Sequence, residues 1–131
     1  MGLAMIMSLI GCSGSVKDSK LVSMEFRESG YNPGFMFRIE NGKITYENYD
    51  QGTGGKRKLD EKTLTELLGV FDSLDIYSWD GYNESNDEML DGMGFSLFVQ
   101  MADGTSITAS GDNCFPENFQ EFEQVILSMM N

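Results

Sequence analysis

The side chains with the most potential for chemistry in this sequence are carboxylates. The 131 residues include 21 Asp and Glu, nine Lys and Arg, two Cys and no His. Without histidine, the sequence lacks Ser-His and Cys-His nucleophile pairs and the commonest general base near neutral pH. Two cysteines cannot build a zinc site. The chemistry that remains is cation binding by oxygen ligands, or hydrolysis by a pair of acids.

Oxygen donors are concentrated in residues 75–94, which lack clear periodicity and are expected to form a long acidic loop. Calcium prefers such ligands, and the candidate calcium ligands are Asp80, Asp87 and Asp91. Their spacing does not fit an EF-hand, because the third position after a start at Asp87 is Met89 and the twelfth is Phe98. A solvated acidic loop is the default interpretation, and calcium binding is the alternative.

Aromatic residues in the same loop indicate a binding surface. Trp79 and Tyr82 could contact a glycan or a protein partner, although a lone Trp beside a helix end more often covers the core. The segment before the last helix adds Asp112 and Asn113, which could also cap that helix, and Cys114, which we expect to be an inert buried residue. The candidate binding residues are Trp79, Tyr82, Asp91, Asp112 and Asn113.

Hydrolysis by paired carboxylates is a third hypothesis. A domain of this size offers little room for a substrate cleft, and most acids fall on expected exposed helix faces or in loops. No pair of acids stands out as catalytic. We therefore expect no enzymatic activity and no cofactor.

The N-terminal segment indicates export. Residues 2–11 are uncharged and mostly apolar, and the run is too short to span a bilayer. Leu9-Ile10-Gly11-Cys12 resembles the lipobox of bacterial lipoproteins, which implies cleavage before Cys12 and its acylation. The acyl chains would anchor the protein in a lipid bilayer, at the cell surface or facing the periplasm. An apolar strand or helix with an ordinary buried cysteine is the alternative.

The lipobox pattern is incomplete in one respect. Lipoprotein signals carry Lys or Arg before the apolar run, whereas the first basic residue here is Lys17. This points to a start codon further upstream or to a weak export signal. We expect a signal peptide over residues 1–11, a polar tether over 12–20 and one domain over 21–131.

Charge is divided unevenly along the chain. Residues 1–62 hold all nine basic residues and eight acidic ones, whereas residues 63–131 hold 13 acidic residues and no basic one. A surface this negative repels nucleic acid and anionic lipid headgroups. The expected partners are therefore a protein, a glycan or a cationic ligand.

Alternation and turn chemistry predict the strands. Leu21 to Arg27 alternates, with Val22, Met24 and Phe26 on one face. Asn41-Gly42 is the preferred type I′ turn, and it predicts a hairpin of residues 35–40 and 43–49. That hairpin places Ile39 opposite Ile44, Phe37 opposite Tyr46, Arg38 opposite Thr45 and Glu40 opposite Lys43. Lys56 to Leu59 is a possible short edge strand. A second hairpin over residues 95–110, turning at Gly104, places Val99 opposite Ile107 and Leu97 opposite Ala109.

Two apolar stripes predict helices. Residues 60–74 carry one of them, at Leu64, Leu67, Leu68, Phe71 and Leu74. Pro116 opens the other helix, whose stripe is Phe119, Phe122, Ile126 and Met129 or Met130. The predicted fold is α+β, with an antiparallel sheet of about five strands and two helices on one face, in the order βββαββα. The order also indicates a degenerate ββα repeat.

Several stretches of the C-terminal part are similar to a family of small, uncharacterised lipoproteins of gut-type bacteria. They are residues 79–82, 90–97, 102–104, 108–113 and 116–119, within a likeness that runs from about Phe35 to the C-terminus. This family has no assigned activity, so the resemblance implies an anchored lipoprotein and no particular chemistry. We therefore expect an exported, membrane-anchored and non-catalytic binding module.

Overall fold

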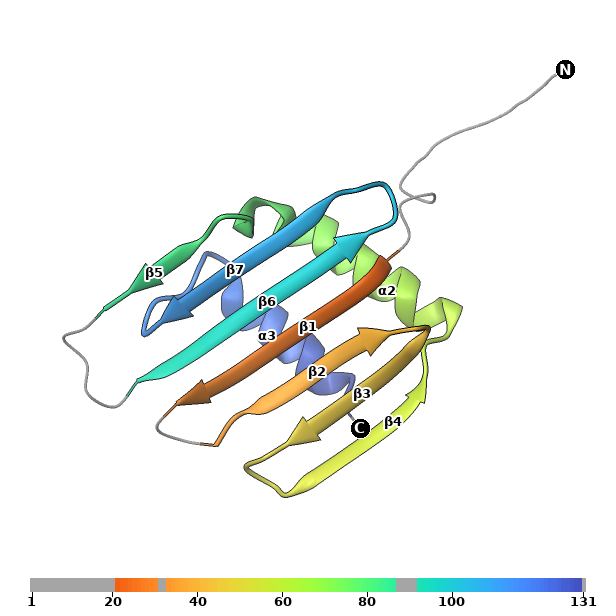
Figure 1. Ribbon diagram of the computed structural model, residues 1–131, viewed down its shortest axis with the longest axis horizontal. Coiled ribbons are helices and arrows are strands. Elements are labelled where there is room, and N and C mark those ends of the chain that lie inside the picture. Colours follow the sequence, from red (N-terminus) through yellow and green to blue (C-terminus); the bar gives the residue numbers. More distant parts are fainter. Residues whose placement is uncertain (1–20, 31–32, 87–91, 131) are drawn as a thin grey trace, which may run out of the picture.

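The computed structural model describes residues 21–30, 33–86 and 92–130, which form one sheet covered by two helices (Figure 1). The strands are β1 (Leu21–Gly30), β2 (Phe35–Glu40), β3 (Lys43–Asn48), β4 (Thr53–Lys58), β5 (Asn83–Ser85), β6 (Met93–Met101) and β7 (Ser106–Asp112). The helices are α2 (Glu61–Ser73), α3 (Phe119–Ser128) and the short 3-10 helix η1 (Ile76–Trp79). The expected signal peptide, Cys12 and tether lie outside the described residues.

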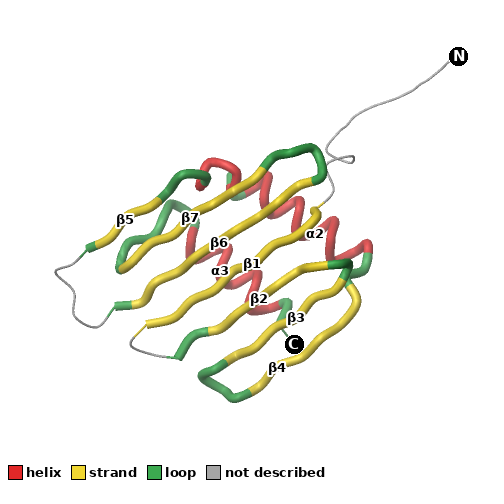
Figure 2. Tube along the Cα trace, viewed as in Figure 1, coloured by secondary structure: helices red, strands yellow, loops and turns green. Residues whose placement is uncertain are grey.

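The sheet has seven strands in the order β4-β3-β2-β1-β6-β7-β5. All neighbours are antiparallel except β5, which runs parallel to β7. Helices α2 and α3 lie behind the same face of the sheet in Figure 2, and no helix of the described residues covers the other face. The predicted α+β class is confirmed, but the predicted five-stranded antiparallel sheet is wrong: the sheet is mixed and has seven strands.

Strand β4 begins three residues before the short edge strand predicted from Lys56, and these three residues include Gly54 and Gly55. Gly55 lies opposite Tyr46 of β3, and a Cβ atom at Gly55 would lie only 2.6 Å from the Tyr46 hydroxyl oxygen. The tyrosine ring therefore occupies the space that a side chain at this position would need. Gly55 belongs to the strand because of this close approach, which a local pattern does not reveal.

Strand β5 and helix η1 occupy much of the first part of the segment predicted to be a long acidic loop over residues 75–94, of which residues 87–91 lie outside the described ranges. The backbone of residues 81–86 follows β7: Ser110 N donates to Tyr82 O (2.9 Å), and Asn86 N donates to Asp112 O (2.9 Å). All three β5 residues are exposed and polar, so they show no alternation. Their strand conformation comes from pairing with β7.

The two hairpins are confirmed residue by residue. All four predicted pairs of the first hairpin are present, and Asn41 and Gly42 both have positive φ, at 53° and 74°. In the second hairpin Val99 pairs with Ile107 and Leu97 with Ala109, as predicted. Turn chemistry and apolar pairing therefore fixed both registers.

The prediction for Val22 is wrong. Met24 and Phe26 are buried, but Val22 is 51% exposed. The register of β1 against β6 shifts between Leu21 and Ser23, so Val22 is the extra residue of an irregularity. Because of this irregularity, the Val22 side chain does not share the buried face of Met24 and Phe26.

The helices follow the predicted stripes, but their caps differ from expectation. In α2, Leu67 and Phe71 are fully buried, and the Asp60 carboxylate caps the helix by accepting from Thr63 N at 2.8 Å. The residue before α3 is Asn118, whose side chain donates instead to Leu74 O (3.1 Å) at the end of α2. The predicted capping of this helix by Asp112 or Asn113 is therefore wrong.

The core between sheet and helices is aromatic. Phe122 of α3 lies against Phe26 of β1 and against Trp79, with ring centroids 5.1 and 5.4 Å apart. Phe119, one turn earlier, contacts Phe95 of β6 at 4.8 Å. At the other end of α3, Arg57 of β4 donates to the Met129 carbonyl. These contacts fix α3 across the middle of the sheet.

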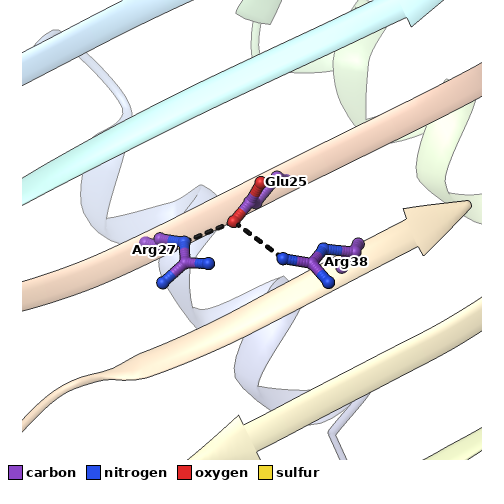
Figure 3. A network of polar contacts seen from close by, with 3 residues as sticks. All are labelled: Glu25, Arg27 and Arg38. Atoms are coloured by element: carbon purple, nitrogen blue, oxygen red, sulfur yellow. Dashed lines mark hydrogen bonds and ion pairs between the residues drawn. The ribbon is translucent and has the colours of Figure 1, made fainter.

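The face without helices is polar at its centre. The Glu25 carboxylate on β1 accepts from Arg27 and from Arg38 of β2, and the Arg38 contact is 3.3 Å (Figure 3). Burial raises the pKa of Glu25, but the hydrogen bonds and charges of the two arginines outweigh this and leave the pKa below its ordinary value.

No helix in the described part of the chain has the length and apolar character of a membrane span.

The aromatic core predicts the cost of truncating its central ring. Phe122→Ala removes a fully buried side chain and leaves a cavity, so we expect a loss of about 3–5 kcal/mol in unfolding free energy, measured by urea denaturation. Phe98→Ala is the control, because Phe98 is 46% exposed, and it should cost less than about 1 kcal/mol. Equal losses in the two variants would contradict this account of the core.

Candidate functional site

A cavity of about 630 Å³ lies between α3 and the adjoining ends of β1 and β6. It lies within the size range of small-molecule sites. Its lining residues are Glu28, Gly92, Met93, Asn113, Phe115, Pro116, Asn118, Phe119, Gln120, Glu121 and Glu123. We call it the glutamate cavity, because three glutamates line it.

Glu28 reaches the cavity because it occupies a core-facing position of β1. It follows Met24 and Phe26 in the alternation, and its strand neighbours on either side are Phe35 and Phe95. Its exposed fraction is only 7%, and its Oε2 atom has no hydrogen-bond partner among the described residues. A buried acceptor without a partner is costly to the folded state, so its presence calls for an explanation.

Glu123 of α3 meets Glu28 from the helix layer. It directly follows the buried Phe122 and is half-buried, and its carboxyl group is hydrogen-bonded to that of Glu28. Two carboxyl groups can form such a bond only if one of them carries a proton. Glu28, whose pKa is raised, is therefore the member of the pair that carries the proton.

Burial is the main cause of the raised pKa of Glu28. Together with the hydrogen bond and the negative charge of Glu123, it raises the pKa of Glu28 to about 9. Glu28 is accordingly neutral at pH 7. No lysine or arginine is among the described lining residues to reverse this effect.

The opposite wall of the cavity is apolar. Phe115 is 42% exposed, and its ring contacts Phe119 at 4.6 Å and Phe95 at 5.8 Å. Met93 and Pro116 complete this wall. The glutamate cavity thus combines a hydrophobic surface with a few convergent polar groups, as ligand sites commonly do.

Asn113 is the predicted binding residue that the structure brings to the cavity. Its backbone N–H donates to Met93 O (3.0 Å), and its side-chain amide donates to Asn86 O (3.2 Å). Its Oδ1 atom is buried without a partner and lies against Gly92, where an added Cβ would be only 1.1 Å away. Glycine at position 92 is therefore required for this placement of Asn113.

The other predicted binding residues lie elsewhere. Trp79 is 3% exposed and donates from its indole N–H to Glu117 O (3.1 Å), so it belongs to the core. Tyr82 is half-buried against Phe95 and lines a separate hollow of about 230 Å³ beside Trp79. Asp112 lines a hollow of about 380 Å³ with Arg27. Asp91 lies outside the described residues.

The calcium candidates do not form a site in the part of the chain that the structure describes. Asp80 accepts from Thr108 N at 2.9 Å, which joins the turn after η1 to β7. Asp87 and Asp91 lie outside the described ranges. Within those ranges no three Asp, Glu or Cys side chains gather at metal-binding distance. Cys114 is partly exposed, so the expectation that it is buried is wrong.

Sequence reasoning missed Glu28 and Glu123, although a signal for each was present. Glu28 interrupts the apolar alternation of β1, and Glu123 falls within the stripe formed by Phe119, Phe122 and Ile126. An acid at a position that should face the core is unfavourable unless it has a partner or a function. Together, the two acids at core-facing positions were the signal in the sequence that pointed to this cavity.

Comparisons with known proteins do not identify the chain. No family model matches it, and no curated protein matches it. The resemblance to small bacterial lipoproteins therefore stays a prediction.

The raised pKa of Glu28 predicts a stability that depends on pH. Between its ordinary value of 4.5 and about 9, the unfolded chain releases a proton that the folded chain keeps, so rising pH favours unfolding. Glu28→Gln removes this pH dependence of stability, because glutamine does not titrate. We expect the variant to gain about 1 kcal/mol over the native chain for each pH unit from 5 to 8, in urea denaturation.

Glu25→Gln is the matched control for this prediction, because Glu25 lies on the same strand with a lowered pKa. Its stabilisation is present above its ordinary pKa and is lost as pH falls through the lowered value. This variant should therefore be less stable than the native chain at pH 7, and the difference should shrink in acid. A Glu28→Gln difference that is constant with pH would refute the protonated state of Glu28.

Proposed function

We propose that the protein is an exported, non-catalytic ligand-binding module, anchored to a membrane through acylated Cys12, and that the glutamate cavity is its ligand site. The observation that carries the ligand site is Glu28, a residue with an exposed fraction of only 7% that lines the cavity and has an oxygen without a partner among the described residues. Functional sites are where proteins keep such groups most often. The lipobox-like Leu9-Ile10-Gly11-Cys12 supports the anchor.

The position of the cavity along β1 suits an anchored protein. The domain begins at Leu21, directly after the expected tether, and Glu28 lies seven residues further along the same strand. At about 3.3 Å per residue, the strand carries the site about 23 Å from the end that would be tethered. The cavity would thus lie at the end of β1 that is remote from the anchor.

Hydrolysis by the two glutamates is the competing function. The carboxyl groups of glycoside hydrolases stand about 5 Å or more apart, so that a glycosidic bond lies between them. Glu28 and Glu123 interact with each other directly instead, through a hydrogen bond and through charge. This contact favours binding over catalysis.

The anchor is tested by acylation in bacterial cells. Cells that express the full chain are grown with an alkyne-tagged fatty acid, and label is measured on the purified protein. We expect label on the native chain and on Cys114→Ala, and no label on Cys12→Ala. A labelled Cys12→Ala variant, or an unlabelled native chain, would contradict the proposed anchor.

The ligand site is tested by nuclear magnetic resonance on the full chain in a nonionic detergent. Small alkylammonium, polyol and carboxylate probes are added in turn. We expect at least one class to shift the backbone amides of Gly92, Met93 and Asn113, with no shift at Lys62 and Glu66, two exposed residues of α2 that line a different hollow. If no class shifts the amides of the cavity, the proposed ligand site is wrong.

A further inference from the structure

The charged groups and the unpartnered acceptors of the glutamate cavity favour a positively charged ligand. Among the described residues, the buried side-chain atoms without a partner are acceptors, namely Glu28 Oε2 and Asn113 Oδ1. Glu121 and Glu123 add carboxylates from α3, and the described lining residues include no lysine or arginine. An anion would find no positive partner here.

The size and walls of the cavity favour an organic cation over a metal ion. About 630 Å³ is far more than a bare ion fills, and no metal-binding cluster is present among the described residues. Phe115, with 42% of its surface exposed, offers an aromatic face beside Pro116 and Phe119. Such a surface suits an alkyl chain, and it also attracts a cationic head group.

We propose that the ligand of this cavity is a small organic ammonium ion, an inference that rests on the binding function proposed above. Its N–H groups donate to the carboxyl pair of Glu28 and Glu123. Its apolar body packs against Phe115 and Phe119. The ligand thus supplies donors that the described residues do not.

Binding exchanges a proton for the ammonium ion. The protonated Glu28 carboxyl releases H⁺ to solvent, and the resulting carboxylate pairs with R–NH₃⁺, so charge is conserved and no covalent bond to carbon changes. The charged group that acts on Glu28 is Glu123 of α3, Glu121 lines the same cavity, and β2 and β6 place Phe35 and Phe95 beside Glu28. The proton released is therefore that of Glu28.

Proton release makes the affinity depend on pH. An alkylammonium ion keeps its charge up to about pH 10, so the ligand does not titrate over the range of interest. If one proton leaves for each ion bound, affinity rises about tenfold for each pH unit between 6 and 8. A simple structural role for Glu28 would not produce this slope.

The test is calorimetric titration of the full chain with hexylammonium in nonionic detergent, with titration into detergent alone subtracted. Hexanol and hexanoate are the neutral and anionic probes of the same length. We expect hexylammonium to bind at least about tenfold more tightly than hexanol, hexanoate not to bind, and affinity to rise with pH.

Variants separate local recognition from general charge attraction. Glu28→Gln and Glu123→Gln should each weaken hexylammonium binding at least about tenfold, and Glu28→Gln should remove the pH slope. Glu66→Gln removes the same charge from an exposed position on α2 and should leave binding unchanged. Equal weakening in Glu66→Gln would overturn the proposal.

The remaining outcomes distinguish this inference from the proposed function. If hexanol or hexanoate shifts the amides of the cavity and hexylammonium does not, the ammonium ligand is refuted while the cavity stands as a ligand site. If none of the three binds and no probe class shifts the cavity, both proposals fail.

Discussion

The packing of α3 on β1 is the interaction on which the other features of this domain depend. Phe122 and Phe119 lie 5.1 and 5.9 Å from the ring of Phe26, and they fix both the position and the rotation of the helix. Successive residues of an α-helix are separated by about 100° around its axis, so the orientation of Phe122 also determines that of Glu123. Apolar burial thereby brings Glu123 to Glu28. The two acids meet because the aromatic rings around them are packed, and not because they attract each other.

Two glutamates of the same strand have pKa values that are shifted in opposite directions. Glu25, on the face without helices, accepts from Arg27 and Arg38, and these cations lower its pKa (Figure 3). Glu28, three residues later on the covered face, meets a second acid instead and is neutral at pH 7. A cation opposite Glu28 would have satisfied its charge, and an apolar residue would have avoided the desolvation cost. Position 28 is not apolar, and no lysine or arginine lies opposite it among the described residues. Glu28 therefore lowers the stability of the folded state, which a residue with a purely structural role would not need to do.

Local signals in the sequence predicted the hairpins, because a turn such as Asn41-Gly42 specifies its own register. They failed at β4 and β5, where strand conformation depends on a partner distant in the chain. Gly55 is a strand residue because the Tyr46 ring lies over it, and Asn83 is one because β7 lies beside it. The candidate site was predictable only at Asn113. Glu28 and Glu123 each stood out as acids at core-facing positions, but their contact requires the tertiary packing of β1 against α3, which neither segment encodes alone.

The uneven distribution of charge along the sequence becomes an uneven distribution of charge across the folded domain. Strands β2, β3 and β4 come from the part that holds all nine basic residues, whereas β6, β7 and α3 come from the part with 13 acids and none. The glutamate cavity is built largely by the acidic part, with β1 as the boundary strand. A field of one sign around a partly enclosed site raises the local concentration of oppositely charged ligands. In the proposed function, the acidic half of the domain would attract cationic ligands over a long range, and the aromatic residues and the carboxyl pair would select among them by shape and donor pattern at contact.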